Sequence, residues 1–375
     1  MDKIKVCILM PSHWSGSKGG AELQSMYITQ HLLQKNDVEV HYICRNFTKA
    51  FSSETVHKIP TGLMSKYSYA IDRAYILKTL SEIKPDYIYQ RVLCSYTGIA
   101  AKFCQKTPTK MIFHIANSPD VEPQTLKFSR RFMFDVAENY YRRYGINNAD
   151  YIIAQAHYQA ESLKQYYHRE CALIMPNISP DIIAEKRSAR PSKKIILWVA
   201  NVKPQKGPEK FLEIASYFQD RPDLEFHMVG KVSTRYANQI KQSTTTLKNV
   251  VFHGELDVSD VNTLMADAFI FVNTSDFEGF PNTFIQAWLN ETPVVSLNVN
   301  PDDLISKHNL GYFCRTQASL LATIKRCADD SQRIAEAGSK CRTFALDYFS
   351  LKNADNLYQL IQEDAHSRRC ENAIS

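Results

Sequence analysis

The first loop that could bind a ligand runs from Ser15 to Glu22, reads Ser-Gly-Ser-Lys-Gly-Gly-Ala-Glu, and follows the apolar run 6–10. Glycines such as Gly19 and Gly20 let the backbone come close to a ligand, and the free N–H groups that open a helix favour an anion. The pattern is neither the Gly-x-Gly-x-x-Gly fingerprint nor a P-loop, so it predicts neither a dinucleotide-binding fold nor an ATPase. It indicates an anion-binding loop, with a flexible turn as the alternative.

A second loop begins at Asn201, directly after the apolar run 195–200, and carries Lys203 and Lys206. Pro208 follows, a residue type favoured at the first position of a helix. Two ammonium groups above the end of a parallel strand suit a diphosphate. The alternative is a solvated basic loop.

The third loop is the most informative, because it follows the apolar run 269–272 and joins an acid to a helix start. The helix is expected to begin near Asn282 or Thr283, where its first N–H groups can bind phosphate. Glu278 lies before the helix and can accept hydrogen bonds from ligand hydroxyls. Gln286, about one turn into the helix, can reach the same ligand. The alternative is a capped surface helix.

Short apolar runs alternate with helical patterns along the whole chain, which predicts β-α-β units and parallel sheets. The expected strands are 6–10, 38–43, 86–89, 110–115, 150–154, 195–199, 224–229, 250–252, 269–272 and 294–297. A segment rich in Pro, Ser and charge, 176–192, separates two such series and suits a linker near residue 185. A helical stretch, 331–364, closes the pattern. We therefore expect two doubly wound α/β domains with a ligand cleft between them.

Taken together, the Gly-Gly-Ala-Glu, Lys-Gly and Glu-Gly-Phe-Pro-Asn stretches resemble glycosyltransferase family 4 (group 1). Supporting stretches at 148–154, 175–177, 252–254 and 292–295 are similar to that family in the same order. The resemblance implies the GT-B fold, in which two Rossmann-like domains face a central cleft. The expected divisions are 1–182 on the acceptor side, 183–345 for the donor, and a helical segment 346–375 that could return to the first domain.

The resemblance also implies transfer of a sugar from a nucleoside-diphosphate sugar, usually with retention at the anomeric carbon. By similarity, Lys206 neutralises the donor diphosphate, Glu278 holds sugar hydroxyls and Gln286 holds the ribose. The residues expected to bind the donor are Gly19, Gly20, Asn201, Lys203, Lys206, Gly279, Phe280, Pro281, Asn282, Thr283 and Gln286. Glu278 and His114 are the expected catalytic residues.

Several positions depart from the family pattern, including the turn after the strand 224–229, where only Gly230 remains of a more glycine-rich stretch. Gln286 stands where the family usually has Glu, so it keeps hydrogen-bonding capacity and loses charge. Asn201 stands where an Arg is usual, and Lys203 could supply the missing charge as a point charge. Glu291 replaces a usual Gly. These departures make the donor preference open and leave a non-catalytic nucleotide-sugar-binding subunit as one alternative.

His114 closes the expected strand 110–115 and so lies at the carboxyl edge of the first sheet. In the family that the sequence resembles, a His near this point contacts the donor sugar. The alternative is a buried structural histidine. His13, in the first loop, is a second candidate, as a base at the acceptor site.

The sequence contains no Asp-x-Asp motif and no His, Asp or Cys cluster with metal spacing, so we expect catalysis without a metal or another cofactor. The departing diphosphate would be stabilised by lysines and a helix N-terminus. No carboxylate nucleophile stands out, which leaves front-face attack by the acceptor hydroxyl as the hypothesis. A nucleotide-sugar epimerase on the same fold is the other enzymatic alternative.

Positive charge gathers in the first half of the 375 residues. Residues 1–170 hold 22 Lys and Arg against 15 Asp and Glu, whereas residues 171–375 hold 23 against 24. Basic and aromatic residues mix in 127–134 and 140–144, a pattern that favours an anionic membrane surface. The alternative is an ordinary helix with its aromatic face in the core and its arginines exposed.

Nine cysteines without a Cys-x-x-Cys pair suit reduced thiols in the cytoplasm, and no run of about 18 uncharged apolar residues could span a membrane. No nucleic-acid-binding module is recognisable. We therefore expect a cytoplasmic enzyme at the inner face of the membrane. Its acceptor would be a glycan or a lipid-linked molecule in the synthesis of cell-surface polysaccharide or lipopolysaccharide.

Overall fold

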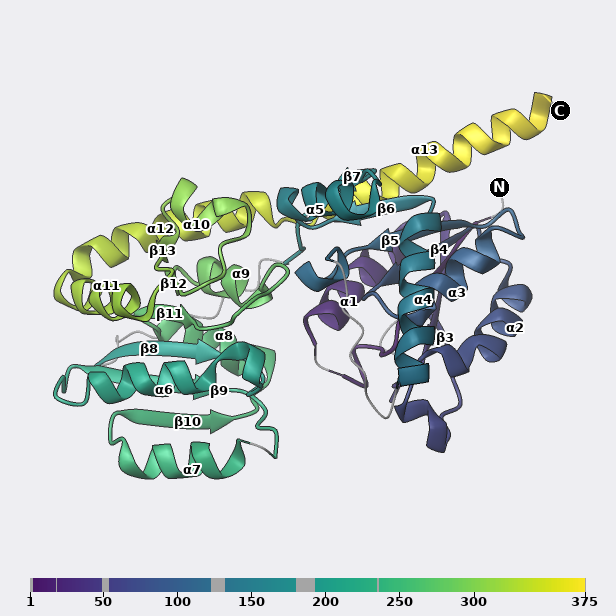
Figure 1. The fold of residues 1–375 in the computed structure, drawn as a ribbon. Coiled ribbons are helices and arrows are strands. Elements are labelled where there is room, and N and C mark those ends of the chain that lie inside the picture. Colours follow the sequence, from purple (N-terminus) through teal and green to yellow (C-terminus); the bar gives the residue numbers. More distant parts are fainter. Residues whose placement is uncertain are drawn as a thin grey trace. The chain divides into compact units, whose positions relative to one another are not determined.

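The computed structural model describes residues 3–17, 19–48, 54–122, 132–179, 193–234 and 236–374. It forms two compact units, one of residues 1–178 with 351–375 and one of residues 179–350 (Figure 1). Most of the expected linker, 180–192, lies outside the described residues. Each unit has its own sheet and its own core.

The first unit is built on a seven-stranded sheet in the order β3-β2-β1-β4-β5-β6-β7, with every pair parallel. Its strands are β1 (Ile4–Leu9), β2 (Val38–Cys44), β3 (Thr55–Lys58), β4 (Tyr87–Arg91), β5 (Lys110–His114), β6 (Tyr151–Ala154) and β7 (Leu173–Ile174). The order reverses at β1, as in a doubly wound fold, and places the ends of β1, β4 and β5 side by side.

Helices cover both faces of this sheet because the strands are apolar on both. In β1, Val6 and Ile8 enter the core under α1 (Gly20–Leu33) and α13 (Lys352–Ile374). Cys7 and Leu9 face the opposite core. That core lies under α2 (Arg73–Ile83), α3 (Ser95–Cys104), α4 (Phe132–Asn148) and α5 (His157–Tyr167). Three short 3-10 helices, η1 (Leu63–Lys66), η2 (Ala70–Asp72) and η3 (Ser118–Asp120), lie in the connections.

The second unit repeats the design with six parallel strands in the order β10-β9-β8-β11-β12-β13. They are β8 (Lys194–Val199), β9 (Leu224–Val229), β10 (Val250–Gly254), β11 (Ile270–Asn273), β12 (Val294–Ser296) and β13 (Gly311–Phe313). One face packs on α6 (Pro208–Tyr217), α7 (Ala237–Thr246) and α11 (Gln317–Asp329). The other packs on α8 (Val258–Asp267), α9 (Asn282–Leu289), α10 (Leu304–Lys307) and α12 (Ser331–Tyr348). Two 3-10 turns are η4 (Pro204–Lys206) and η5 (Pro301–Asp303).

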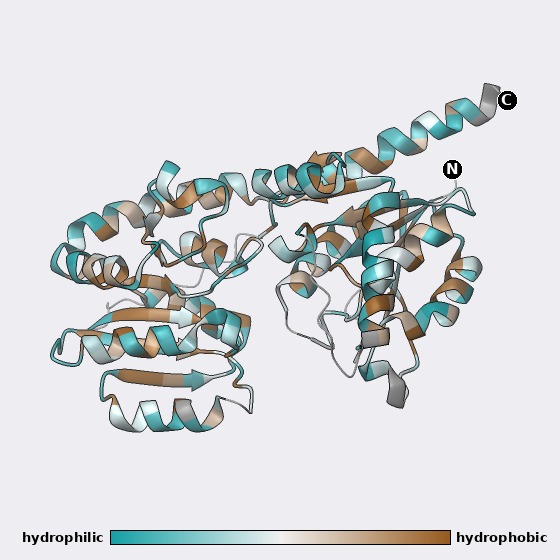
Figure 2. Ribbon diagram, viewed as in Figure 1, coloured by the Kyte–Doolittle hydropathy of each residue, from teal (hydrophilic) through white to brown (hydrophobic). Residues whose placement is uncertain are grey.

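These two parallel, doubly wound units confirm the predicted fold class, and each expected strand is present within one or two residues. Figure 2 shows hydrophobic residues concentrated in the strands and hydrophilic ones on the outer sides of the helices. The helical stretch expected over 331–364 is confirmed and is divided into α12 and α13. The two helices are separated where Phe349 turns into the core against Trp288 and Phe280. Within the described ranges no helix is long and apolar enough to cross a bilayer.

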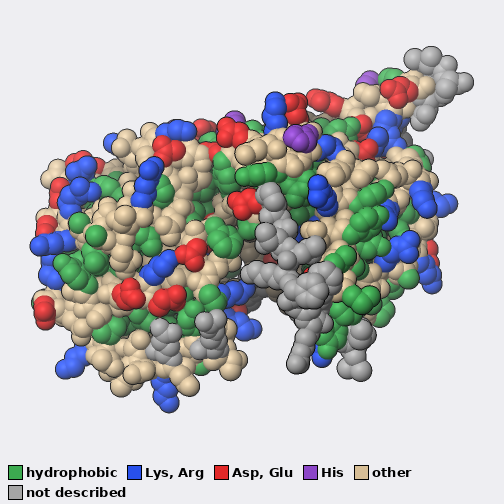
Figure 3. Space-filling view, viewed as in Figure 1, with side chains coloured by type: hydrophobic (Ala, Val, Ile, Leu, Met, Phe, Trp, Pro, Cys, Tyr) green, Lys and Arg blue, Asp and Glu red, His purple; other side chains and the backbone are tan. Residues whose placement is uncertain are grey.

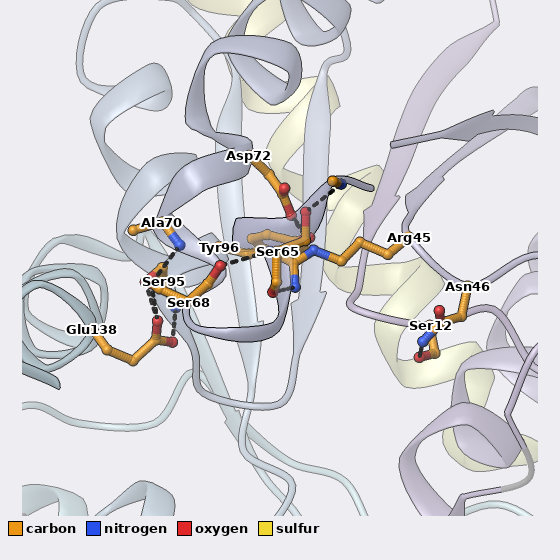
Figure 4. A network of polar contacts seen from close by, with 11 residues as sticks. Ser12, Arg45, Asn46, Ser65, Ser68, Ala70, Asp72, Ser95, Tyr96 and Glu138 are labelled. Atoms are coloured by element: carbon orange, nitrogen blue, oxygen red, sulfur yellow. Dashed lines mark hydrogen bonds and ion pairs between the residues drawn. The ribbon is translucent and has the colours of Figure 1, made fainter. Parts of the chain in front are cut away.

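A buried polar network fixes the segment before α2 to the end of β2 (Figure 4). The Arg45 guanidinium donates to the Asp72 carboxylate at 2.5 Å and to the carbonyl oxygens of Ser65 and Ser68 at 2.5 and 2.7 Å. The Tyr96 hydroxyl donates to the same carboxylate. The charge of Arg45 is therefore neutralised inside the unit, which makes Asp72 costly to remove.

We expect Asp72→Ala to lower the free energy of unfolding by about 3–5 kcal/mol, because it leaves the buried Arg45 charge without its partner. Glu82→Ala is the matched control, since its ion pair with Lys78 is exposed and should contribute less than about 1 kcal/mol. Denaturant unfolding of both variants measures the difference. Equal losses in the two variants would contradict this assignment.

Candidate functional site

Two loops of the second unit are joined where β8 and β11 end. The Thr274 hydroxyl lies 2.8 Å from the carbonyl oxygens of Lys206 and Gly207 and accepts a hydrogen bond from the Trp198 indole N–H at 2.9 Å. The backbone N–H of Asp276 donates to the carbonyl oxygen of Gln205 at 2.9 Å. Because neighbouring parallel strands end at the same edge, these bonds turn two distant sequence segments into one platform.

Gly207 is needed for this junction. Its φ is +58°, and a Cβ there would stand 2.5 Å from the carbonyl oxygen of Thr274. A larger residue would therefore be strained and would also force the loops apart. Pro208 directly after it opens α6, as the sequence predicts.

The platform brings Lys206 and Glu278 together. The Lys206 ammonium donates to the Glu278 carboxylate, which also accepts from the Ser275 hydroxyl at 2.7 Å. The two charged side chains are 24% and 11% exposed, so the pair lies in a partly desolvated place where charge interactions are stronger than in water. A carboxylate and an ammonium group are thus held in fixed positions beside each other.

A second ion pair joins the same two segments. Lys210 lies 2.6 Å from the Asp276 carboxylate, and this pair is more exposed than the first. Its position makes it an internal comparison for the Lys206–Glu278 pair, since both pairs link the same loops.

Helix α9 starts at Asn282, as predicted, directly after Pro281. Asn282 and Thr283 are partly exposed, whereas the Phe280 ring is buried, 5.0 Å from the Phe349 ring. Phe280 therefore anchors the loop in the core, and what it could offer a ligand is backbone. The buried Gly279 precedes it.

Gln286 lies one turn into α9 and is half-buried. Its amide nitrogen stands 3.5 Å from the Asn262 amide oxygen on α8, which is a weak contact. Asn201 and Lys203 follow β8 and are exposed. Within the described part of the chain, neither of these two side chains has a hydrogen bond or ion pair.

In the first unit, Gly19 caps α1, and its carbonyl oxygen accepts from the N–H of Leu23 at 3.0 Å. The Glu22 carboxylate folds back beside Gly19, where a Cβ would stand 2.1 Å from it. An anion at Gly19 and Gly20 would therefore have to share this helix N-terminus with Glu22. Lys18 of the same loop lies outside the described residues.

His114 is the last residue of β5 and is completely buried. Its Nδ1 accepts from the Arg91 guanidinium at 3.0 Å, and the Tyr89 hydroxyl lies 2.8 Å from the same nitrogen. Arg91 also donates to the Asn177 amide oxygen at 2.8 Å. Burial, and then the charge of Arg91, hold the pKa of His114 well below its usual range. The ring is therefore neutral, with its proton on Nε2.

His13 is also buried in the first unit. Its Nδ1 accepts from the backbone N–H of Ser15 at 3.1 Å and lies 2.8 Å from the Ser15 hydroxyl, while its Nε2 stands 3.5 Å from the Glu54 carboxylate. Burial lowers the pKa of His13. Both ring nitrogens thus face protein atoms, which suits a role in holding the loop.

The structure adds residues that the sequence did not single out. They are Thr274, Ser275, Tyr89, Arg91 and Asn177. Ser275 had a usable signal, because it stands three residues before Glu278 in a turn. Across the described ranges, no three His, Cys, Asp or Glu side chains are grouped so that they could hold a metal ion.

Comparison with known proteins matches both halves of the chain to family models. Residues 18–177 match the model described as Glycosyltransferase Family 4, and residues 193–330 match Glycosyl transferases group 1. A curated relative is poly(ribitol-phosphate) alpha-N-acetylglucosaminyltransferase of Staphylococcus aureus, 23% identical over 169 residues. That match covers 43% of this chain and only about a third, 34%, of the relative.

Several solved structures share the fold over nearly the whole chain. Sucrose-phosphate synthase from Thermosynechococcus elongatus has a TM-score of 0.80 at 14% identity and covers 97% of this chain and 100% of its own. WaaG, a glycosyltransferase involved in lipopolysaccharide biosynthesis, has 0.76 at 17%, covering 93% and 98%. HepE from Anabaena, in complex with UDP and glucose, has 0.72 at 19%, covering 97% and 100%. With both family models matched in order, the chain belongs to glycosyltransferase family 4, group 1.

Proposed function

We propose that this chain transfers a sugar from a nucleoside-diphosphate sugar to a glycan or lipid-linked acceptor in the synthesis of cell-surface polysaccharide. The observation that carries the proposal is the Lys206–Glu278–Ser275 cluster, held where β8 and β11 end and next to the start of α9. The second unit would bind the donor and the first unit the acceptor.

The main chemical demand of the reaction is negative charge on the departing diphosphate. Lys206 on the platform, the exposed Lys203 and the N-terminus of α9 can each stabilise that charge. We propose that these groups stabilise the leaving diphosphate without a divalent cation or a further cofactor.

Glu278 is suited to hold the donor sugar. Its carboxylate is fixed by Lys206 and Ser275, and carboxylate oxygens accept several hydrogen bonds at once. In this proposal Lys206 bridges the carboxylate and the diphosphate, so that the sugar and the leaving group are positioned by one ion pair. Gln286 would bind the ribose hydroxyls through its amide, and Gly279 to Thr283 would meet the phosphate through their backbone.

The predicted contact of His114 with the donor sugar would require this completely buried, neutral ring to become accessible. Because Tyr89 and Arg91 occupy Nδ1, the Nε2–H is left as its donor. For the bond exchange we propose front-face attack with retention. The acceptor oxygen bonds to the anomeric carbon, the carbon–oxygen bond to the phosphate breaks, and the hydroxyl proton passes to the leaving diphosphate.

The relatives suggest where to look for substrates. HepE binds UDP-glucose, so uridine diphosphate sugars are the first donors to test. WaaG acts in lipopolysaccharide biosynthesis, and the S. aureus relative is named for poly(ribitol phosphate). Because acceptors of these kinds belong to cell-surface polymers, we propose that this chain works in the cytoplasm at the inner face of the membrane.

A panel of nucleotide sugars, scored for nucleotide release with and without membrane extract, tests the proposal. Release from one donor only in the presence of extract supports transfer. Conversion of the donor to an isomer without an acceptor would instead identify an epimerase. Binding without either reaction would identify a non-catalytic subunit.

We expect Glu278→Gln and Lys206→Gln each to lower the transfer rate about a hundredfold or more, because each removes a charge that positions the reacting groups. Steady-state kinetics with the donor found above measures the loss. Double substitution should cost little more than one, since the two residues act as a pair.

Asp276→Asn and Lys210→Gln are the matched controls, because they break the exposed ion pair on the same loops. We expect them to stay within about threefold of the wild type. If the transfer rate of Glu278→Gln also stayed within about threefold of the wild type, the assignment of this site would be wrong.

Removal of divalent cations should not stop the reaction. We expect the protein treated with EDTA and then desalted to keep its transfer rate within about twofold, because lysines and a helix N-terminus supply the positive charge. Assays with and without added Mg²⁺ and Mn²⁺ check this. Loss of activity with EDTA that either ion restores would contradict metal independence.

The neutral His114 predicts a pH dependence of stability. Its pKa in the folded state lies well below the usual value near 6.5, so below that pH the unfolded chain binds the proton and the folded unit does not. The stabilisation is complete above about pH 6.5 and is lost as the pH falls. The free energy of unfolding of wild type should therefore fall further than that of His114→Gln between neutral and acidic pH.

Denaturant unfolding at several pH values makes that measurement, with the exposed His366→Gln as control. The control should follow the wild-type curve. Parallel curves for wild type and His114→Gln would show that His114 gains its proton in the folded state as easily as in the unfolded one.

A further inference from the structure

Helix α4 is held against α3 by contacts too close for a side chain. A Cβ on Gly98 would stand 2.2 Å from the carbonyl oxygen of Tyr141, and a Cβ on Gly145 would stand 2.6 Å from the carbonyl carbon of Thr97. Side chains at these points would push the helices apart. The backbone of α4 therefore has a fixed distance from α3 and a fixed side turned toward it.

Glu138 fixes the same side of α4. Its carboxylate accepts from the backbone N–H of Ser95 at 2.7 Å and from the Ser95 hydroxyl at 2.6 Å, and from the Ser68 hydroxyl at 3.0 Å (Figure 4). These bonds satisfy hydrogen-bond donors at the start of α3, and they hold the Glu138 carboxylate inside the unit. Rotation of α4 would break them.

The opposite side of α4 carries three exposed apolar side chains and one arginine. We call it the outer stripe, made of Met133, Val136, Tyr140 and Arg143. The first three side chains are 83%, 40% and 52% exposed. Their spacing of three and four residues keeps them on one face of the helix. Figure 3 shows hydrophobic side chains gathered along this helix. A helix surface that only met water would be polar here.

Positive groups border the outer stripe. Lys102 of α3 stands 4.7 Å from the centre of the Tyr140 ring, and Arg143 ends the stripe. The neighbouring 3-10 segments expose Ile71 and Lys66. Of the two carboxylates on α4, Glu138 is turned inward and Asp135 is partly buried.

We propose that the outer stripe of α4 is a docking surface for an anionic lipid bilayer. Exposed apolar side chains would enter the headgroup region, the tyrosine would lie at the interface, and Lys102 and Arg143 would meet lipid phosphates. The charge around the stripe favours this occupant over a second, similarly charged copy of the chain. The proposal rests on the proposed function, since it would bring the acceptor-side unit to lipid-linked acceptors.

Co-sedimentation with vesicles tests the proposal on the full-length chain. Wild type should bind vesicles of phosphatidylglycerol and phosphatidylcholine in equal parts and should bind pure phosphatidylcholine weakly. The triple variant Met133→Ser, Val136→Ser, Tyr140→Ser should lose at least about tenfold in partitioning. The charge variant Lys102→Glu, Arg143→Glu should lose binding to the anionic vesicles, and added salt should weaken the wild type.

The control is a triple change to Ser at exposed apolar residues of the other unit, Tyr217, Val258 and Leu346. It should bind vesicles as wild type does. Equal vesicle binding by the outer-stripe variant, or none by wild type, would overturn the proposal. A concentration-dependent dimer that the outer-stripe variant abolishes would identify a second copy as the occupant and overturn it too.

Stabilisation by UDP separates this proposal from the proposed function. The outer-stripe variants should keep the shift in melting temperature that a bound nucleotide gives, because the donor groups lie in the other unit. Loss of vesicle binding with that shift intact supports the docking surface. A wild type that binds vesicles without responding to any nucleotide would count against the enzymatic proposal alone.

Discussion

The hydroxyl of Thr274, which contacts the backbone of Lys206 and Gly207, makes the contact on which the platform at the ends of β8 and β11 depends. Lys206 and Glu278 belong to loops more than seventy residues apart. They meet because β8 and β11 are neighbours in the sheet and because Gly207 leaves room for the second loop. The order of the strands brings the two loops close together, and Thr274 and Gly207 then fix the loops so that Lys206 and Glu278 form an ion pair.

Much of the fold could be predicted from the sequence because its central strands are buried on both faces. Such strands read as continuous apolar runs, as in Ile195–Val199 and Leu224–Val229. Strands β3, β7 and β13 were missed for the opposite reason. Each is an edge strand of two to four residues with mixed exposure, so neither length nor hydrophobic pattern distinguishes it from a loop.

In the candidate site, the sequence could predict only those residues whose place follows from their position along the backbone. Loops that follow strands could be located, and with them Lys206 and Glu278. The residues around His114 could not be predicted, because they come from separate segments. Arg91 ends β4, His114 ends β5 and Asn177 follows β7, and only the folded sheet brings them together. The aromatic stretch 140–144 was ambiguous in the same way. Tyr141 and Tyr144 pack toward the core, whereas Tyr140 points outward. The close contacts of the glycines between α3 and α4 decide which tyrosines face the core.

The helix α13 has a consequence for how the chain is made. Its Ala354, Leu357 and Ile361 complete one core of the first unit, together with side chains of β1 and α1. Synthesis runs from the N-terminus, so this unit begins first and finishes last, after the whole second unit has emerged. Until then, apolar side chains on one face of its sheet remain exposed to solvent. A chain that ends at residue 350 would therefore have a complete second unit and a first unit whose exposed apolar surface chaperones can bind.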